Sequence, residues 1–366
     1  MNNNNLLNKS QKSAIQYINK YVLQYKKEAQ NDINQIINFT NNDLNEYNSA
    51  IENIKNYAKV GIHFHPDRPD QTFKTTIENL FDQGIYKNQF ETFTSSGGLS
   101  AYKGGDRNKW EKILFGGSYN KFFIKDSERP KYGAIDLFHN PDGPSPRFGS
   151  CYFLLKPEVS KRCTFTYMDS HLNPKEKGTL EEFDLIMSGL LRDTFHYNNT
   201  LGENDISVKN LLIHLNNELI KPMEDLSNKN AKRHLNHYIE AQVHGNISLK
   251  EDVKIMVADP SFKETGIGDK IVQTCNKYSI KLLWHMGFSL KVNEVPDDFR
   301  GNEMPQLAKF ITNEPSIDTH HLGLAVFDLY SNPKKWEKWG SQKDIIQKIK
   351  LLWHILVKYG QKYKAK

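Results

Sequence analysis

The chain has 366 residues, of which 38% are hydrophobic and 25% are charged, so it can bury a core and does not have a disordered composition. Its net charge of +6 is scattered along the sequence instead of forming one basic segment, which argues against nucleic-acid binding. No apolar run reaches the ~20 residues of a membrane-spanning helix, so we expect no membrane span, and the first residues predict no secretory signal peptide.

Residues 1–59 are expected to form an N-terminal helical region. Apolar side chains recur at helical spacing within residues 14–25 and again within 44–58, so each stretch presents one apolar face. The run Thr-Asn-Asn-Asp at 40–43 supplies side chains that can cap the second helix. Such helices most often pack against the rest of the protein.

Residues 60–262 are expected to form a core of strands and helices. Short apolar or alternating runs bounded by turn residues, such as "GAIDLF" and "SCYFLLK", predict strands. Residues 179–195 and 208–226 predict helices between them. Because strands and helices do not alternate regularly, the predicted fold class is α+β with mainly antiparallel sheets.

Residues 263–366 are expected to form a C-terminal helical region packed on the core. In the last predicted helix Ile345, Ile349, Leu352 and Leu356 share one face, and Gly360 suits a C-terminal stop.

The cysteines indicate a reducing compartment. Cys151, Cys163 and Cys275 are odd in number, far apart, and form no Cys-x-x-Cys motif. This pattern argues against a disulfide framework and against a cysteine zinc site, and it fits the cytoplasm.

The segment "GIHFHPDRP" raises the question of a metal site. His63 and His65 are two residues apart on a predicted strand, so their side chains point to one face and could chelate a metal ion. A zinc site needs further ligands, and no spacing pattern selects one. The candidates are His139, His171, His244 and His285. Two histidines satisfied by hydrogen bonds are the more common arrangement, so we expect no metal.

Two other segments could bind a polar ligand. Residues 88–119 contain three Gly-Gly pairs but fit neither the P-loop nor the dinucleotide-binding glycine pattern. The hydroxyls at 92–96 followed by two glycines suit a close approach of the backbone to a ligand, although a plain turn has the same composition. On a predicted strand at 238–245, Glu240, Gln242 and His244 share one face, which is either a buried polar site or the outer face of an edge strand.

Read in chain order, these motifs resemble the arginine-serine-glutamate branch of the ADP-ribosyltransferase superfamily. The matching positions are Arg68 after an early strand, residues 94–96, and Glu-Ala-Gln at 240–242. A narrower resemblance covers residues 10–362. It links "HFHPDR", "WEKILFGG", "YIEAQVHG" and "LLWHILVKYG" to a family of formerly uncharacterised bacterial proteins that includes effector-type mono-ADP-ribosyltransferases.

The resemblance implies a fold and a set of site residues. The implied fold is an ADP-ribosyltransferase-like core of two small antiparallel sheets, at 60–262, flanked by N- and C-terminal helices, with NAD between the sheets. The implied catalytic residue is Glu240, with Gln242 orienting the acceptor, and Arg147 is a further candidate for an anion contact. The residues implied to contact NAD are His65, Arg68, Thr94, Ser95, Gly97, Gly98 and Arg107. The family pattern puts its catalytic glutamate second, where this chain has Gln242, and residues 94–96 match Ser-Thr-Ser only approximately.

The implied activity is mono-ADP-ribosylation of a protein. Such an enzyme cleaves NAD at the nicotinamide–ribose bond and transfers ADP-ribose to a side chain, here expected to be an arginine of a target protein, which could be a host protein. The expected partners are NAD and that acceptor. The expected location is the cytoplasm, or a host cytosol reached through a dedicated secretion system. The alternatives are an NAD glycohydrolase, a non-catalytic module that binds NAD or a partner, and a metallohydrolase built on His63 and His65.

Overall fold

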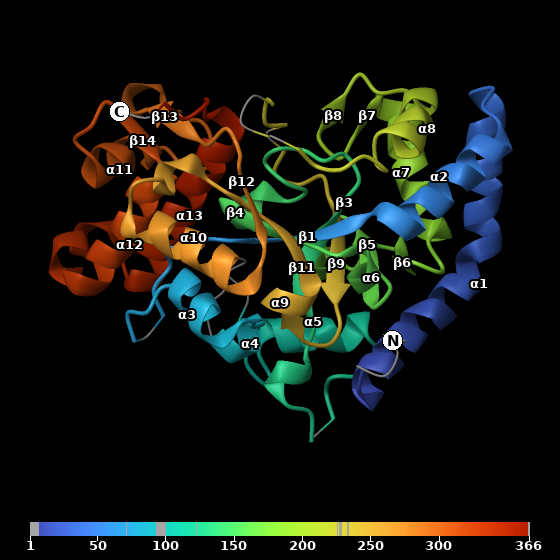
Figure 1. Cartoon of the computed structure of the whole chain (residues 1–366), viewed down its shortest axis with the longest axis horizontal. Coiled ribbons are helices and arrows are strands. Elements are labelled where there is room, and N and C mark those ends of the chain that lie inside the picture. Colours follow the sequence, from blue (N-terminus) through green and yellow to red (C-terminus); the bar gives the residue numbers. More distant parts are fainter. Residues whose placement is uncertain are drawn as a thin grey trace.

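One large sheet organises the structure (Figure 1). The computed structural model describes residues 7–364 except 71, 93–99, 122, 225, 227–228 and 233. The strands of the large sheet are β1 (Lys59–Phe64), β3 (Lys131–Asp136), β4 (Cys151–Leu155), β5 (Cys163–Tyr167), β6 (Lys177–Thr179), β9 (Ile239–Val243), β11 (Val253–Ala258) and β12 (Lys281–Trp284). These eight strands lie in the order β12-β11-β4-β1-β3-β9-β5-β6. Neighbours are antiparallel except β11 and β12, which are parallel.

This sheet confirms the expected mixture of helices and mainly antiparallel strands, but its layout differs from two small sheets. Strand β1 pairs with β3 on one side and with β4 on the other, and Gly61 faces Ala134 in one pair and Leu154 in the other. The two halves of the sheet are therefore hydrogen-bonded into one. Such pairings between distant segments cannot be read from the periodicity of any single strand.

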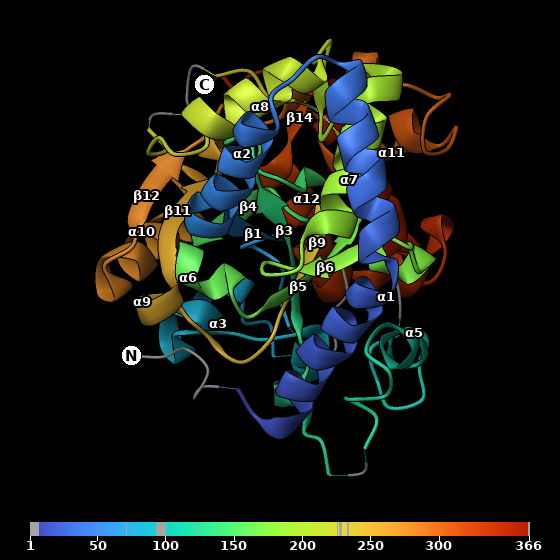
Figure 2. The same ribbon diagram turned by 90° about the vertical axis from the view of Figure 1, so that its right-hand side faces the viewer.

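Four helices cover the apolar face of the sheet (Figure 2). They are α1 (Lys9–Phe39), α2 (Leu44–Tyr57), α7 (Asp184–Tyr197) and α8 (Val208–Asn217). Helix α1 packs on α7 and α2 packs on α8. The predicted N-terminal helices are confirmed, and Asp43 caps α2 by accepting a hydrogen bond from the backbone N–H of Asn45.

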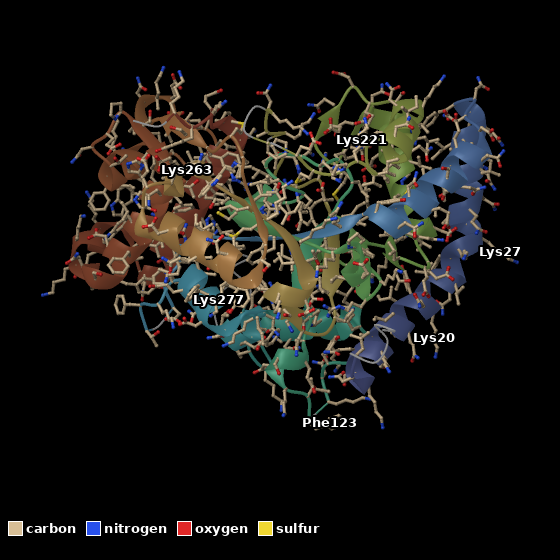
Figure 3. All side chains as sticks on the ribbon, viewed as in Figure 1. Lys20, Lys27, Phe123, Lys221, Lys263 and Lys277 are labelled. Atoms are coloured by element: carbon tan, nitrogen blue, oxygen red, sulfur yellow. The ribbon has the colours of Figure 1, made fainter. Side chains whose placement is uncertain are left out.

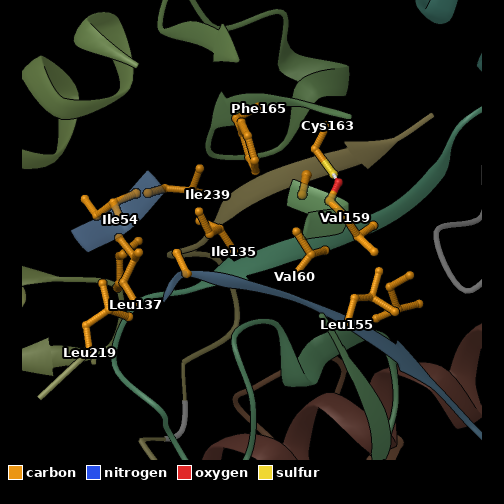
Figure 4. Close-up of a cluster of buried hydrophobic side chains, with 14 of the residues drawn as sticks. Ile54, Val60, Ile135, Leu137, Leu155, Val159, Cys163, Phe165, Leu219 and Ile239 are labelled. Atoms are coloured by element: carbon orange, nitrogen blue, oxygen red, sulfur yellow. Dashed lines mark hydrogen bonds between the residues drawn. The ribbon is translucent and has the colours of Figure 1, made fainter. Parts of the chain in front are cut away.

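The main hydrophobic core lies between these helices and the sheet (Figure 4). Ile54 of α2 meets side chains from successive strands, among them Val60 of β1, Ile135 of β3 and Ile239 of β9, all at most 2% exposed. Because side chains alternate along a strand, the residues between these apolar ones point to the opposite face of the sheet. That opposite face carries the polar residues described below.

The C-terminal region has a second hydrophobic core of its own. It is built from α11 (Met304–Ile311), α12 (Thr319–Ser331), α13 (Gln342–Tyr359) and the strand pair β13 (Ser289–Lys291) and β14 (Ser316–Asp318). Helix α13 ends at Gly360, as predicted, but with φ −58° and not in the left-handed region. A Cβ atom at Gly360 would lie 2.3 Å from the carbonyl oxygen of Leu356, so close packing explains the glycine.

The remaining elements border the sheet and connect these layers. They are α3 (Thr76–Gln83), α4 (Gln89–Thr92), α5 (Asp106–Leu114), α6 (Pro157–Ser160), α9 (Leu249–Asp252), α10 (Gly266–Tyr278), the strand pairs β2 (Ile85–Tyr86) with β10 (Ile247–Ser248) and β7 (Asn199–Thr200) with β8 (Glu203–Asn204), and the 3-10 helices η2 (Asp126–Glu128), η3 (Pro146–Phe148), η4 (Ser170–Leu172), η5 (Pro260–Phe262), η6 (Val292–Glu294) and η7 (Pro333–Trp339).

Two surface properties bear on function. Lysines labelled in Figure 3, among them Lys20, Lys221 and Lys277, lie on separate parts of the surface, in agreement with the scattered charge of the sequence. Within the described ranges, no helix has the length and apolar character needed to cross a membrane.

Candidate active site

A cavity of about 330 Å³ opens on the polar face of the sheet. Strands β3 and β9 form its floor, and α5, η3, the segment around η4 and α13 contribute to its walls. The lining residues are His63, Tyr86, Lys87, Asn88, Gln89, Arg107, Trp110, Lys131, Tyr132, Gly133, Ser145, Arg147, Phe148, Asp169, His171, Glu240, Gln347 and Lys350. A concave site that gathers cations, carboxylates and aromatic rings from distant segments is a typical ligand site.

Glu240 of β9 is the central carboxylate of this cavity. Its side chain is buried, and its Oε1 atom accepts hydrogen bonds from the Ser170 hydroxyl and from Gln242 Nε2. Burial raises the pKa of Glu240 to about 7, and the neighbouring charge of Asp169 acts in the same direction against the two hydrogen bonds. A carboxyl group with this pKa can take up or release a proton near neutral pH.

Asp169 is the second carboxylate, and its pKa moves the opposite way. Burial would raise the pKa of Asp169, but hydrogen bonds from His171 and Tyr238 outweigh burial and hold this pKa below its usual value. The Asp169 carboxylate lies 3.0 Å from His171 Nδ1 and 2.9 Å from the Tyr238 hydroxyl. Two carboxyl groups whose pKa values are shifted apart are typical of a site for acid–base chemistry.

A buried network of hydrogen bonds extends from Glu240 through Gln242 into the protein interior. Gln242 Oε1 accepts from the Thr164 hydroxyl at 2.7 Å, and Thr164 Oγ1 lies 3.1 Å from His244 Nε2. On the other side of the ring, His244 Nδ1 lies 2.6 Å from the Tyr119 hydroxyl. Gln242, Thr164 and His244 are completely buried, so none of these groups has water as an alternative partner.

The donor and acceptor in each of these hydrogen bonds follow from the Glu240 carboxylate, which can only accept. Because Glu240 Oε1 accepts, Gln242 must present its NH₂ group to Glu240 and its oxygen to Thr164. The single Thr164 hydroxyl proton is then committed to Gln242, so His244 Nε2–H must donate to Thr164. His244 Nδ1 is left to accept from Tyr119. Burial lowers the pKa of His244 to about 3, which agrees with a neutral ring of this tautomer.

Arg107 of α5 brings a guanidinium group to the same cavity. Its side chain lies over the rings of Trp110 and Tyr132, at 4.8 and 4.9 Å from their centroids, and the residue is only 5% exposed. Its Nε atom is buried and has no hydrogen-bond partner among the described residues. A guanidinium held over two neighbouring rings keeps donors for an anionic or carbonyl group of a ligand.

The structure brings some of the sequence-predicted residues together. Glu240, Arg107 and Arg147 line the cavity, and Gln242 lies directly behind Glu240 without lining it. Strand β9 lies between β3 and β5, so the alternative of an outer face on an edge strand was wrong. The predicted contacts Thr94, Ser95, Gly97 and Gly98 lie outside the described residues.

His65 and Arg68, which the resemblance implied as NAD contacts, are not among the residues that line this cavity. His65 packs edge-on against Trp353 of α13 with ring centroids 5.2 Å apart, and Arg68 pairs with the adjacent Asp67 at 3.0 Å. Strand β1 ends at Phe64, so both residues follow the strand and are not part of the sheet.

His63 lines the cavity instead. Its Nδ1 lies 2.9 Å from the Gly149 carbonyl oxygen, and its Nε2 accepts from the backbone N–H of Ser145 at 3.2 Å. A Cβ atom at Gly149 would lie 2.3 Å from the Phe64 backbone, so a glycine is needed to bring this carbonyl close to β1. Within the described part of the chain, no group of three or more His, Cys, Asp or Glu residues is arranged to hold a metal ion.

Sequence reasoning missed Asp169, Ser170 and Lys350. Asp169 and Ser170 directly follow a predicted strand, β5, in the polar run Asp-Ser-His, and polar residues at the end of a strand are a signal that could have found them. Lys350 had no such signal, because it lies within an ordinary amphipathic helix.

Comparisons with known proteins give one family match and one curated relative. A model of the family described as "Protein of unknown function (DUF3626)" matches residues 59–359, which include every residue of the cavity lining. The "Gene 2 protein" of Mycobacterium phage D29 is 27% identical over 188 residues, which are 50% of this chain and 61% of that protein. The chain thus spans about six-tenths of the length of this relative.

Proposed function

We propose that this chain, which belongs to the DUF3626 family, is an NAD-dependent mono-ADP-ribosyltransferase whose active site is the cavity around Glu240. The observation that supports it most is the pair Glu240 and Asp169, with pKa values shifted in opposite directions beside the guanidinium of Arg107. The choice of NAD as the substrate comes from the resemblance of the sequence motifs to those of ADP-ribosyltransferases. On this proposal the sheet with its helices is an ADP-ribosyltransferase-like core in which the two sheets have merged.

The reaction balances as a transfer between two nitrogen atoms. The bond between ribose C1′ and the nicotinamide nitrogen breaks, and its electron pair stays on the ring, which leaves as neutral nicotinamide. A nitrogen of the acceptor guanidinium forms the new bond to C1′. The guanidinium must lose a proton as it attacks, because it is charged at pH 7. Ionised Glu240 accepts that proton.

Asp169 has the complementary task. Cleavage of the glycosidic bond builds positive charge on the ribose, and a fixed carboxylate in a shielded cavity stabilises that charge. Its low pKa keeps Asp169 ionised throughout the pH range in which Glu240 titrates. The acceptor on this proposal is an arginine of a protein, either in the cell that makes the enzyme or in a host.

The test is transfer of label from NAD. The purified chain is incubated with NAD labelled in its adenylate phosphate and with a protein lysate, and label on protein is measured. We expect labelling by the wild-type chain and a loss of about 10²- to 10⁴-fold in Glu240→Gln, the range for a general base. The amide keeps an acceptor oxygen for Ser170 and Gln242, so the fold should survive. Glu158→Gln, which changes an exposed glutamate on α6, is the matched control.

Each other outcome has a definite meaning. Free ADP-ribose without labelled protein would replace the transferase with an NAD glycohydrolase. NAD binding without turnover would favour a non-catalytic module. Full labelling by Glu240→Gln would remove Glu240 from the mechanism.

A further inference from the structure

A buried hydrogen bond joins two distant segments at one wall of the cavity. Trp353 Nε1 of α13 donates to the carbonyl oxygen of Pro146 at 3.0 Å, and both groups are buried. This bond fixes η3 against α13 and so brings Arg147 to the helix. Lys350 lies three residues before Trp353, and both Arg147 and Lys350 line the cavity.

Two basic residues of this wall, Arg147 and Lys350, and the neighbouring Arg300 have no acidic partner among the described residues. In the described ranges no carboxylate oxygen lies within 4.0 Å of a charged nitrogen of Arg147, Arg300 or Lys350, whereas Lys348 on the same helix pairs with Glu303 at 3.6 Å. Arg147 donates to a neutral oxygen, Asn236 Oδ1, at 3.0 Å. The Nε atoms of Arg147 and Arg300 are buried without hydrogen-bond partners among the described residues.

These side chains lie close enough to repel one another. Burial lowers the pKa of Lys350 to about 8, and the charges of Arg147 and Arg300 add to that effect against the weaker pull of Asp169. His354, one turn further along α13, has a pKa lowered to about 3 by burial and by the charges of Arg300, Lys350 and Arg147. Unpaired like charges gathered at a cavity wall destabilise the empty protein, so their grouping points to an anionic ligand.

We propose that Arg147 and Lys350 form a phosphoanion subsite at the α13 wall of the cavity, with the charge of Arg300 beside them, and that this subsite binds the diphosphate group of the substrate. The guanidinium forks suit bidentate contacts with phosphate oxygens, and the ammonium group adds a point charge. Asp169 acts electrostatically on both Lys350 and Glu240, so it connects this wall with the carboxylate of β9. The identity of the ligand as NAD rests on the proposed function, whereas the affinity for a diphosphate does not.

The experiment measures binding to the full chain by calorimetry. The probes are inorganic pyrophosphate, inorganic phosphate, ADP and adenosine. We expect the wild-type chain to bind pyrophosphate and ADP, and Lys350→Gln and Arg147→Gln to weaken both by about ten- to a hundredfold, the loss typical of a charge-assisted hydrogen bond. Adenosine binding should not change between variants. Lys348→Gln is the matched control, since that lysine is already paired on the same helix.

The outcomes separate this subsite from the transferase. Unchanged pyrophosphate affinity in Lys350→Gln, or equal affinity of the wild-type chain for phosphate and pyrophosphate, overturns the diphosphate subsite. If Arg147→Gln fails to fold, Lys350→Gln decides, because Lys350 makes no hydrogen bond among the described side chains. If the chain binds ADP but does not consume NAD, the transferase proposal is overturned and the subsite proposal stands. If the chain transfers ADP-ribose and the Lys350→Gln variant has an unchanged KM for NAD, the transferase stands and the diphosphate subsite is overturned.

Discussion

The side chain of Gln242 donates a hydrogen bond to the carboxylate of Glu240, with Gln242 Nε2 2.9 Å from Glu240 Oε1. Gln242 is completely buried, and its remaining bonds go to Thr164 and Thr166. Its amide therefore has one orientation, and that orientation fixes the Glu240 side chain at the cavity. In this chain the Glu-x-Gln motif combines the cavity carboxylate with the residue that positions it.

The pH dependence of transfer should follow Glu240. In the proposed mechanism the ionised form of Glu240 accepts the proton. Because its pKa is about 7, kcat/KM for NAD should fall as the pH drops below about 7. The measurement is initial transfer rate against pH from 5 to 9, with circular dichroism at each pH as the control for unfolding. An acid limb centred near the ordinary glutamate pKa would contradict this environment for Glu240.

In the Gln242→Glu variant, the fall in transfer rate on the acid side of the pH profile should occur at higher pH. A second buried carboxyl beside the first makes it harder for both to ionise, so the pKa of Glu240 should rise further. We expect lower kcat at pH 7 with partial recovery at pH 9, and little change in KM. The same profile in Gln242→Glu and wild type would show that the two side chains do not interact as described.

Stability should depend on pH through the same carboxylate. Its folded pKa lies above the unfolded value, so the folded state binds a proton more tightly, and stability is lost as the pH rises through about 4.5 to 7. At one pKa unit per 1.36 kcal/mol, the shift from 4.5 to about 7 amounts to about 3 kcal/mol. Glu240→Gln should therefore raise Tm at pH 8 and have little effect at pH 4. Thermal denaturation at both pH values measures the difference, and Glu158→Gln is the control.

Tyr119→Phe should disturb the site from its far end. Removal of the hydroxyl leaves His244 Nδ1 without its donor in a fully buried place, which costs about 1–3 kcal/mol. We expect lower stability and a reduced kcat with an unchanged KM. Tyr102→Phe, at an exposed tyrosine, is the control and should leave both quantities unchanged.

Arg68→Gln distinguishes the structure from the motif resemblance. Arg68 pairs with buried Asp67 and does not line the cavity, so its loss should lower the free energy of unfolding by leaving Asp67 uncompensated. KM for NAD should change little. A large rise in KM with unchanged stability would instead support Arg68 as an NAD contact, and the double variant Asp67→Asn with Arg68→Gln should recover much of the lost stability.

The sequence predicted those parts of the site that depend on one segment alone. Alternation along β9 correctly placed Glu240, Gln242 and His244 on one face, because the two-residue period is a local property. Arg147 and Arg107 were named through the motif resemblance and not through alternation. Neither kind of reasoning could place His65 and Arg68, since the end of β1 is decided by its pairing with β3 and β4. Lys350 joins the cavity through the packing of α13 on η3, about which no local pattern carries information.

The cavity is shared between β9 near the middle of the chain and α13 near residue 350. During synthesis the strands and the carboxylate of Glu240 leave the ribosome long before Lys350 does, and domains generally fold in that order. An incomplete nascent chain would thus contain Glu240 without the basic residues of α13. The site would then be complete only after α13 has been synthesised and Trp353 has packed against Pro146.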